Sequence, residues 1–596
     1  MNAKFKFRIL TGVMLVATLC FATACNDDWN EHYSDSGVNT GETLKEIIEK
    51  EEDLSDFCEV LNACNCLDSL LDKTRVYTLF APVNGSFDKD ALLDDIKAGN
   101  RDDVFKRFVC GHLTNYLHPA NGVLADDNRI MLLNSKVVSF VGRDKKYKFG
   151  DVMLDGENYN IRACNGILHK LNGGYRYMPN LWEYIAQDER ISQLSNFLYS
   201  YYKKDTLWNL SIEGPVVNGE ATYLDTVYGY SNPWFDNTPG RENGGFGNID
   251  CEDSVYIMVA PTNDIWDEMV AKTRTYYNYE KFDTATAEEW LRLDSLQECY
   301  SQRMLCNYLV FNKNEQKEGS DELLSTFSYF DKGEYSRRRF SKSAIMSNLV
   351  ESVPLSNGEM YIVDNYPYTT YEIFHDTIIV EAENAKYEYN KSYSNAPTVN
   401  YVKDGEMNEN IVGEVSNEGY LAVRPKTSSS KPSATFSIPN TLSASYYISA
   451  VFVPKNITDQ NMDEDEIISC RMNISLIKEH MLNNKKQTTV LYETTGGIFT
   501  NPNVIDTLTL YNEEDNIGGD YETRGAPKKF KFDFCEFGKD LEHTTIKLQI
   551  TAFPDDWDPE LYERGFNLDC IILQPVENDI VEDGGSDSDG TVGDDE

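Results

Sequence analysis

Positive charge is scarce in this chain of 596 residues. Its 55 lysines and arginines stand against 98 aspartates and glutamates, which gives a formal net charge of −43 at pH 7. A surface of this sign repels phosphate backbones and anionic lipid headgroups, and this argues against nucleic acid as a partner. The net charge does not identify a ligand, because an acidic surface also keeps a protein soluble.

Recognisable catalytic motifs are also lacking. The sequence has no Gly-x-Ser-x-Gly elbow, no His-Glu-x-x-His pair and no glycine-rich phosphate loop followed by lysine. It has only seven histidines. Carboxylates are too abundant to exclude a glycosidase pair, since such a pair is defined in space. We predict a protein that is not an enzyme, with a poorly marked hydrolase as the enzymatic alternative.

Long apolar runs are confined to the N-terminus. Three basic residues among the first eight precede an apolar stretch over residues 9–22, which is the pattern of a secretory leader. Ala-Thr-Ala then stands before Cys25, and Asn-Asp-Asp follows it. Elsewhere no segment approaches the roughly 18 apolar residues of a spanning helix. Removing residues 1–24 would lower the net charge to −46, because that segment has three basic and no acidic residues.

The residues around Cys25 resemble a bacterial lipobox, in which this cysteine is acylated and becomes the new N-terminus. The acidic residues behind it resemble the export signal of surface lipoproteins of the Bacteroidetes. The resemblance implies a signal peptide over 1–24, a lipidated linker over 25–39, and an outer-membrane location facing the cell exterior. The competing interpretation is an ordinary signal peptide with an incidental cysteine.

Cysteine usage argues against a disulfide scaffold. The cysteines after Cys25 are odd in number and thinly spread over a large chain. Several lie in apolar runs, such as residues 108–110 and 304–306, where a free cysteine packs as a small hydrophobe. We expect mostly buried thiols.

Three motifs occur twice in the same order. The pairs are residues 77–87 with 256–266, 109–113 with 305–309, and 165–172 with 357–364. The first motif predicts a buried strand that ends at a proline, followed by an asparagine at a helix-cap position. The third is an Asn-Gly turn that leads into a strand. The chain therefore contains an internal repeat.

Phe-Ala-Pro-x-Asn-x-x-Phe, a central His-Leu and a closing Asn-Gly-x-x-His together resemble the fasciclin domain. The resemblance implies a compact α+β fold, in which helices cover a wedge of strands, and a role in adhesion or extracellular interaction. Residues 40–182 match well. Residues 186–370 form a degenerate copy with an insertion at about 228–250.

Two histidines of the first copy have no counterpart in the second. His112 and His169 belong to the fasciclin-like motifs, and Tyr308 and Tyr361 replace them in the second copy. Because tyrosine occurs at these positions, we expect the histidines to be hydrogen-bonded structural residues rather than bases or ligands.

From about residue 376 the pattern changes to short strand-like runs between turns rich in Asn, Gly, Pro and Ser, which predicts an antiparallel jelly-roll β-sandwich over 376–576. The expected strands are 377–382, 434–438, 446–453, 467–477, 529–534, 545–552 and 569–573. The acidic tail, 577–596, is predicted to be disordered. The predicted fold class is thus two α+β domains followed by an all-β domain.

Residues 380–384 and 565–571 resemble the first and last strands of jelly-roll carbohydrate-binding modules. The resemblance implies a structural calcium held by Glu381, Glu383 and Asp569, since a hard cation takes oxygen ligands. The alternative is that these carboxylates cap and solvate strand ends. No other cofactor is expected.

Aromatic residues in loops are the candidates for ligand binding, because flat rings flanked by polar groups hold sugars. Trp557 and Tyr562 precede the last strand, where the related modules have a binding cleft. Trp234 and Phe235 lie in the insertion and would suit a partner-binding loop. For Trp557 and Tyr562, core packing is the alternative; for the insertion, the alternative is a disordered loop.

We expect a non-catalytic surface lipoprotein that binds glycan or assists its uptake. It would be an accessory to a TonB-dependent outer-membrane transporter and its lid lipoprotein. The alternative is a surface adhesin or assembly module that recognises a protein partner.

Overall fold

The computed structural model describes residues 41–576, except 69–74, 157, 208–210, 214–222, 226–227, 239–244, 281–285, 332–333, 404, 483–484, 495, 513–520, 535–544 and 553–560. The leader, Cys25, the linker, Trp557 and the tail therefore lie outside the described residues. The chain forms two compact units: the first holds the described residues up to Asn180 with Cys251–Asp253 and Leu355–Asn357, and the second holds the others. Within the described residues, no helix is long and apolar enough to cross a membrane.

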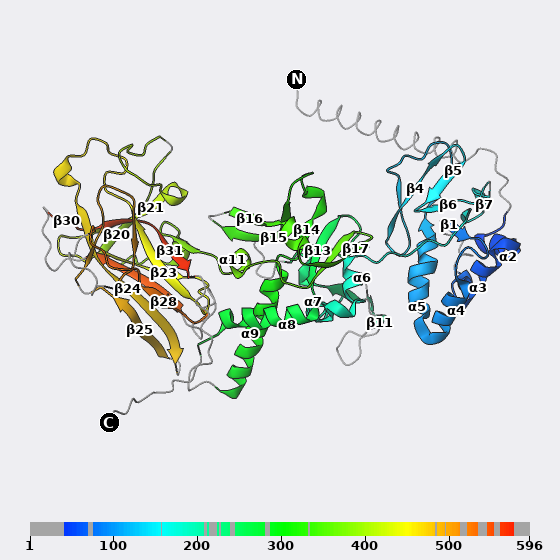
Figure 1. Cartoon of the computed structure of the whole chain (residues 1–596), viewed down its shortest axis with the longest axis horizontal. Helices are drawn as coiled ribbons and strands as arrows, with labels where there is room; N and C mark the ends of the chain where they lie inside the picture. Colours follow the sequence, from blue (N-terminus) through cyan, green and yellow to red (C-terminus); the bar gives the residue numbers. More distant parts are fainter. Residues whose placement is uncertain are drawn as a thin grey trace, which may run out of the picture. The chain divides into compact units, whose positions relative to one another are not determined.

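The first unit contains the first repeat (Figure 1, blue to cyan). Its two sheets have the strand orders β2-β1-β8-β7 and β3-β4-β5-β6. The strands are β1 (Tyr77–Pro82), β2 (Leu113–Asn115), β3 (Arg129–Met131), β4 (Val137–Arg143), β5 (Lys146–Phe149), β6 (Val152–Met153), β7 (Ile161–Ala163) and β8 (Gly166–Leu171). The helices are α2 (Leu44–Lys50), η1 (Glu52–Leu54), α3 (Ser55–Ala63), α4 (Lys89–Asp95), η3 (Ile96–Asn100), α5 (Arg101–Val104), η4 (Phe105–Val109) and η5 (Cys110–His112).

Strand β1 is buried on both faces. Leu79 and Ala81 pack in a core with residues of α2 and α3, whereas Phe80 points the other way, into a core with Phe140 and Phe149 of the second sheet. Alternate side chains of a strand point to opposite faces, so a strand between helices and a second sheet must be apolar throughout. This explains the continuous apolar run of the first motif.

The second repeat (Figure 1, green) lies in the second unit and has one six-stranded sheet, ordered β16-β15-β14-β13-β18-β17. The strands are β13 (Tyr256–Pro261), β14 (Val310–Asn312), β15 (Glu322–Asp331), β16 (Glu334–Ser341), β17 (Leu349–Leu355) and β18 (Gly358–Val363). The helices are α6 (Leu181–Ile185), η6 (Glu189–Ile191), α7 (Ser192–Tyr199), η7 (Pro233–Phe235), α8 (Asn263–Arg274), η8 (Thr275–Tyr277), α9 (Ala287–Cys306), η9 (Lys313–Glu315), α10 (Lys342–Met346) and α11 (Thr370–Ile373). Two hairpins precede β13: β9 (Lys203–Thr206) pairs with β12 (Tyr228–Ser231), and β10 (Ile212–Glu213) with β11 (Tyr223–Asp225).

The sheet registers confirm the internal repeat. Strands β1 and β8 pair in parallel with Tyr77 opposite Gly166, and β13 and β18 pair in parallel with Tyr256 opposite Gly358. The same register places Tyr361 at the position of His169, as the sequence predicts.

The other tyrosine is shifted by one residue from its predicted place. Leu113 lies opposite Leu79 in the first repeat, and Val310 lies opposite Met258 in the second. In the sheet, Leu309 rather than Tyr308 is therefore the counterpart of His112. A comparison of short sequence motifs cannot detect that one residue is added or missing before the strand.

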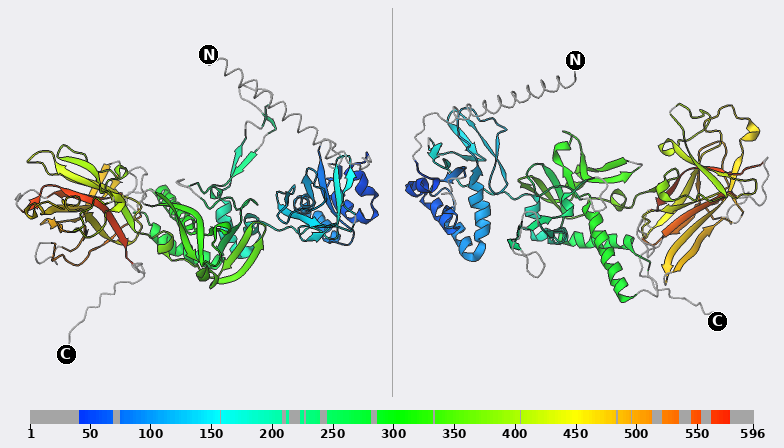
Figure 2. Two further views of the ribbon diagram at one scale, coloured as in Figure 1. Left: turned by 90° about the horizontal axis from the view of Figure 1, so that it is seen from above. Right: turned by 180° about the vertical axis from the view of Figure 1, so that it is seen from behind.

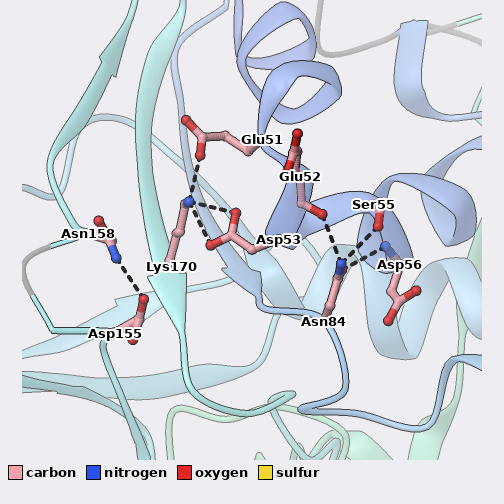
Figure 3. Close-up of polar contacts among 9 residues, drawn as sticks. All are labelled: Glu51, Glu52, Asp53, Ser55, Asp56, Asn84, Asp155, Asn158 and Lys170. Atoms are coloured by element: carbon pink, nitrogen blue, oxygen red, sulfur yellow. Dashed lines mark hydrogen bonds and ion pairs between the residues drawn. The ribbon is translucent and has the colours of Figure 1, made fainter.

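The motif asparagine makes the same contacts in both repeats. In the first, Asn84 donates to the Glu52 carbonyl (2.9 Å) and Ser55 Oγ (2.8 Å) and accepts the Asp56 N–H (2.9 Å), as Figure 3 shows. In the second, Asn263 donates to the Glu189 carbonyl (2.8 Å) and Ser192 Oγ (3.1 Å) and accepts the Gln193 N–H (2.9 Å). The predicted helix-capping role is thus corrected to a bridge from the end of the strand to the start of another helix, α3 or α7.

Figure 3 also shows a lysine that only the first repeat has. Lys170 in β8 is 4% exposed, and its Nζ lies 2.7 Å from both Glu51 Oε2 and Asp53 Oδ1. In the register of the second repeat, Ile362 occupies this position opposite Ala260. The ion pairs are thus a local replacement for an apolar contact.

The remainder of the second unit is a sandwich of two mainly antiparallel sheets (Figure 2, yellow-green to red). One sheet has the order β20-β21-β31-β23-β27, with β19 on β31 and β28 on β23; the other has β22-β29-β24-β25, with β26 and β30 on β24. The strands are β19 (Ile378–Glu381), β20 (Asn395–Tyr401), β21 (Gly419–Pro425), β22 (Ser433–Ile438), β23 (Ser445–Phe452), β24 (Ser469–Leu482), β25 (Lys485–Glu493), β26 (Ile498–Phe499), β27 (Asp506–Thr509), β28 (Lys529–Lys531), β29 (Thr545–Ala552), β30 (Tyr562–Glu563) and β31 (Phe566–Pro575). Short helices are η10 (Ala385–Tyr387), η11 (Ser416–Glu418) and η12 (Glu464–Glu466).

One apolar core lies between these two sheets. It contains Phe436 and Leu548 from one sheet and Ile448 and Leu568 from the other, all fully buried. Each predicted strand of the sandwich overlaps an observed one. The predicted fold class, α+β domains followed by an all-β sandwich, is confirmed.

Candidate binding sites in the sandwich

The first and last strands of the sandwich bring two of the predicted carboxylates, Glu381 and Asp569, together. Glu381 ends β19 and lies opposite Cys570 of β31, next to Asp569. Glu381, Asp569 and Cys570 are buried, and each offers a ligand atom within 4.8 Å of the others. Glu383 follows two residues after Glu381, and its charge contributes to raising the pKa of Asp569.

Ser416 organises this cluster and was not predicted from the sequence. Its backbone N–H donates to both carboxylate oxygens of Asp569 (3.1 Å each), and its Oγ donates to Oε1 of Glu381 (2.8 Å). Ser416 begins η11, far in sequence from both strands. A lone serine in a polar loop gives no signal in the sequence, because only the tertiary fold places it there.

The cluster is electrostatically suited to a cation. Burial, with a smaller contribution from the Glu381 charge, raises the pKa of Glu383 and that of Asp569 to about 7. Oε2 of Glu383 is buried with no hydrogen-bond partner in the described part of the chain. Buried carboxylates need a proton or a positive charge nearby, so Glu381, Glu383 and Asp569 fit a hard divalent cation.

Cys570 is a poor ligand for the same ion. Burial, followed by the charges of Asp569 and Glu381, raises the pKa of its thiol well above the usual range. A protonated sulfur is a soft and weak donor, whereas calcium takes oxygen. The cysteines that the structure describes are all free thiols, and several of them are buried.

Tyr562 forms a tilted aromatic pair with Phe499 at the edge of the sandwich. Its β30 strand pairs in parallel with the start of β24. The Tyr562 ring is half-buried, with its centroid 5.4 Å from that of Phe499. The Arg471 guanidinium lies over both rings, 5.4 Å from Phe499 and 5.6 Å from Tyr562. Neither Arg471 nor Phe499 was predicted, because contacts across strands are not visible in single motifs.

A small cleft of about 20 Å³, with apolar as well as polar lining residues, lies at the same end of the sandwich. Its lining residues Cys470, Thr500 and Glu563 are the chain neighbours of Arg471, Phe499 and Tyr562. It lies at the end of the sandwich where β21 and β23 end and β24 and β31 begin. Its polar lining comprises Arg424, Lys455, Thr500, Asn501, Glu563 and Asn567. Lys455 Nζ lies 2.9 Å from Glu563 Oε1.

The two aromatic residues predicted in the insertion do not form an exposed anchor. Trp234 is only 2% exposed and stacks on Phe246, with ring centroids 5.2 Å apart. Phe235 is half-buried and packs edge-on against Trp182 (4.8 Å). The prediction that Trp234 binds a partner is therefore corrected: the insertion folds its tryptophan into the core because burying a large ring is strongly favourable.

The two histidines are structural, as expected. Each is fully buried, donates from one ring nitrogen to a backbone carbonyl, and accepts a backbone N–H at the other. The contacts join His112 to the Phe108 carbonyl (2.8 Å) and the Tyr175 N–H (2.9 Å), and His169 to the His118 carbonyl (3.0 Å) and the Asn160 N–H (3.3 Å). Burial lowers the pKa of both rings to about 4, so both are neutral at pH 7.

Comparison with known proteins finds no matching family model and no matching curated protein. Among solved structures, the chain is similar to a FAS1 domain pair of the insect cell adhesion molecule Fasciclin I. The identity is 11% and the TM-score 0.18, over 54% of this chain and 98% of that one. It is also similar to a carbohydrate-binding module of the β-sandwich superfamily, at 8% identity and a TM-score of 0.14, over 42% and 70% of the two chains. A xanthan lyase of Paenibacillus matches at 10% identity and a TM-score of 0.17, over 46% and 20%. These likenesses are too low to carry an argument, and the fold class rests on the sheets and registers described above.

Proposed function

We propose that this chain is a non-catalytic binding protein, anchored to the outer membrane by a lipid on Cys25, and that its sandwich holds glycan. The observation that carries the proposal is the cleft at the end of the sandwich, whose lining residues Thr500 and Glu563 are the chain neighbours of the aromatic pair Phe499 and Tyr562. A flat ring next to hydrogen-bonding side chains is what a sugar needs, since its ring stacks while its hydroxyls are satisfied. The leader and the lack of recognisable catalytic motifs support display and binding rather than chemistry.

The carboxylate cluster would hold a structural calcium. Glu381, Glu383 and Asp569 would be its ligands, and the ion would supply the positive charge that these buried groups require. Through Ser416 it would also fix the loop at η11 against β31. Strand β31 contributes Asn567 to the cleft, so the ion would stabilise one wall of the binding site.

A partnership with a TonB-dependent transporter and its lid lipoprotein is part of the proposal. In that setting the sandwich captures glycan, and the two α+β repeats lie between it and the lipid anchor along the chain.

The second candidate function is recognition of a protein partner. One observation favours it: the β9–β12 hairpin presents Tyr228 and Tyr230, which are 45% and 67% exposed. Tyrosine is enriched in protein interfaces because it combines a large ring with a polar tip.

The test is affinity electrophoresis of the mature chain without its lipid-bearing cysteine, residues 26–596, in native gels containing single polysaccharides. We expect retardation by at least one glycan and about tenfold weaker binding for Tyr562→Ala, which is the loss of one good stacking contact. Tyr401→Ala is the matched control. Tyr401 is 63% exposed and pairs with Gly419 at the start of β21, whereas the cleft lies where β21 ends. Thermal unfolding of each variant excludes misfolding.

Absence of retardation across a panel of neutral and acidic glycans would contradict the proposal that the chain binds glycan. Recovery of a specific outer-membrane polypeptide by cross-linking, lost in a Tyr228→Ala/Tyr230→Ala variant, would then establish the second candidate.

A further inference from the structure

Among the residues that the structure describes, the lining of the cleft has an excess of positive charge. This part of the lining contains Arg424 and Lys455 and one carboxylate, that of Glu563. Lys455 and Glu563 form an ion pair and neutralise one another. The positive charge of Arg424 therefore has no counter-charge within the described lining of the cleft.

Arg424 is held by neutral acceptors. Its Nη1 donates to the carbonyls of Phe566 (2.9 Å) and Val423 (3.3 Å), and its Nη2 donates to Oδ1 of Asn567 (2.5 Å). Asn567 is itself fixed by a bond from its Nδ2 to the Val453 carbonyl (3.2 Å). No carboxylate contacts Arg424 among the residues that the structure describes, so no ion pair there balances its positive charge.

These bonds leave the arginine ready for an anion. A guanidinium has five N–H donors in a rigid plane, and three contacts do not exhaust them. Because the strand and Asn567 hold the plane in place, little side-chain entropy remains to be lost when a ligand binds. Carboxylate and sulfate match this planar donor geometry better than a neutral hydroxyl does.

The size of the cleft restricts which part of a ligand can enter. Its space of about 20 Å³ admits only a small substituent and excludes a sugar ring. A sugar ring would therefore lie outside the cleft while a substituent reaches inward.

We infer that the cleft selects an anionic saccharide, whose carboxylate or sulfate group enters the cleft and binds Arg424. This inference rests on the glycan-binding function proposed above and adds the ligand class. It predicts discrimination between glycans that share a backbone and differ only in charge.

The test compares polygalacturonate with fully methyl-esterified pectin in affinity gels of the mature chain, and adds a sulfated galactan as a third arm. We expect retardation by an anionic polymer and at least tenfold weaker retardation by the esterified one. Polygalacturonate alone would assign the carboxylate, and the sulfated galactan alone would assign the sulfate ester.

Three variants locate the site. Arg424→Gln should weaken binding of the anionic polymer about tenfold and Arg424→Lys less, because lysine keeps the charge but loses the planar donor pair. Lys403→Gln removes the same charge at an exposed position two residues beyond β20 and should have no effect. Thermal unfolding confirms that each variant is folded.

Two results would overturn the inference. Equal retardation by polygalacturonate and its methyl ester would show that charge is not recognised, while the glycan-binding function would stand. Equal weakening by Arg424→Gln and Lys403→Gln would show unspecific attraction. Binding to no polysaccharide at all would instead remove the proposed function and the inference together.

Discussion

At the scale of single residues, two buried carboxyl groups make the sandwich sensitive to pH. The pKa values of Glu383 and Asp569 are raised to about 7 by burial, whereas carboxyls of an unfolded chain titrate near pH 4. Between about pH 4 and 7 the folded state therefore binds more protons than the unfolded state. Without a cation, the free energy of unfolding falls as the pH rises through this window.

Calcium should reverse that loss. We expect it to slow hydrogen exchange of the β31 amides and raise the unfolding temperature of the sandwich by several degrees at pH 8, with little effect at pH 5, where protons occupy the site. Glu383→Gln should be more stable than the natural chain in EDTA at pH 8 and respond less to calcium. Glu388→Gln, at an exposed neighbouring position, should behave like the natural chain. An undiminished calcium response of Glu383→Gln would place the cation elsewhere.

The buried histidines give the first repeat the opposite dependence on pH. Their folded pKa values of about 4 lie below the unfolded value near 6.5. The unfolded state thus binds more protons between pH 4 and 6.5, and stability falls as the pH falls through that range, by up to about 3 kcal/mol for each ring. Hydrogen exchange of β1 and β8 amides should show this loss.

His169→Gln tests the assignment. The variant should lower stability at pH 7, since the His118 carbonyl or the Asn160 N–H loses its partner, and it should flatten the pH dependence by about half. The same slope in the variant and the natural chain would contradict the linkage.

The residues of the candidate site were predictable where they belong to a strong local motif and hidden where only the tertiary fold brings them to the site. Glu381 and Asp569 are in the first and last strands and Glu383 follows the first, and the local patterns there are strong. Ser416 and Arg424 reach the site through tertiary packing alone. Trp234 shows the converse: a tryptophan in an inserted loop was expected at the surface, and the loop folds back and buries it.

At the scale of elements, one asparagine ties each α+β repeat together. Asn84 and Asn263 each make three hydrogen bonds that join the end of the central strand to the start of a helix. We expect Asn84→Ala to destabilise the first repeat by about 2–3 kcal/mol, because about 1 kcal/mol is lost for each bond. Urea denaturation followed by hydrogen exchange of β1 measures this loss.

Figure 3 contains the matched control. The Asn158 side chain makes one exposed hydrogen bond, to Asp155 Oδ2 (2.8 Å), so Asn158→Ala should change stability by less than about 0.5 kcal/mol. Equal effects of the two substitutions would show that the bridge is not structural.

The elements themselves were largely predictable, but their alignment was less so. Apolar runs ending in Pro-x-Asn located β1 and β13, and Asn-Gly turns located β8 and β18, because backbone chemistry enforces these patterns. In the sheet, Leu309 rather than Tyr308 is the counterpart of His112 of the first repeat. This shift by one residue arises before a strand, where the length of the chain varies without disturbing the sheet. The sheet of the second repeat also contains β15 and β16, and none of the repeated sequence motifs predicted these two strands.

At the scale of the whole molecule, the proposed lipid on Cys25 is what would hold the chain at a membrane. The strongly negative net charge opposes adsorption to anionic headgroups, so a chain without its lipid should not return to the surface electrostatically. We expect Cys25→Ser to lose incorporation of a labelled fatty acid and to move from the membrane fraction to the soluble fraction.

Cys20→Ser is the matched control, because Cys20 lies in the same leader but is preceded by leucine rather than by small residues. It should leave both labelling and fractionation unchanged. Protease added to intact cells should degrade the natural chain if the lipid faces outward. Labelling that survives Cys25→Ser and disappears with Cys20→Ser would move the start of the mature chain by five residues. Labelling that survives both would make the leader an ordinary signal peptide and leave the glycan-binding test unaffected, since that test uses a chain without lipid.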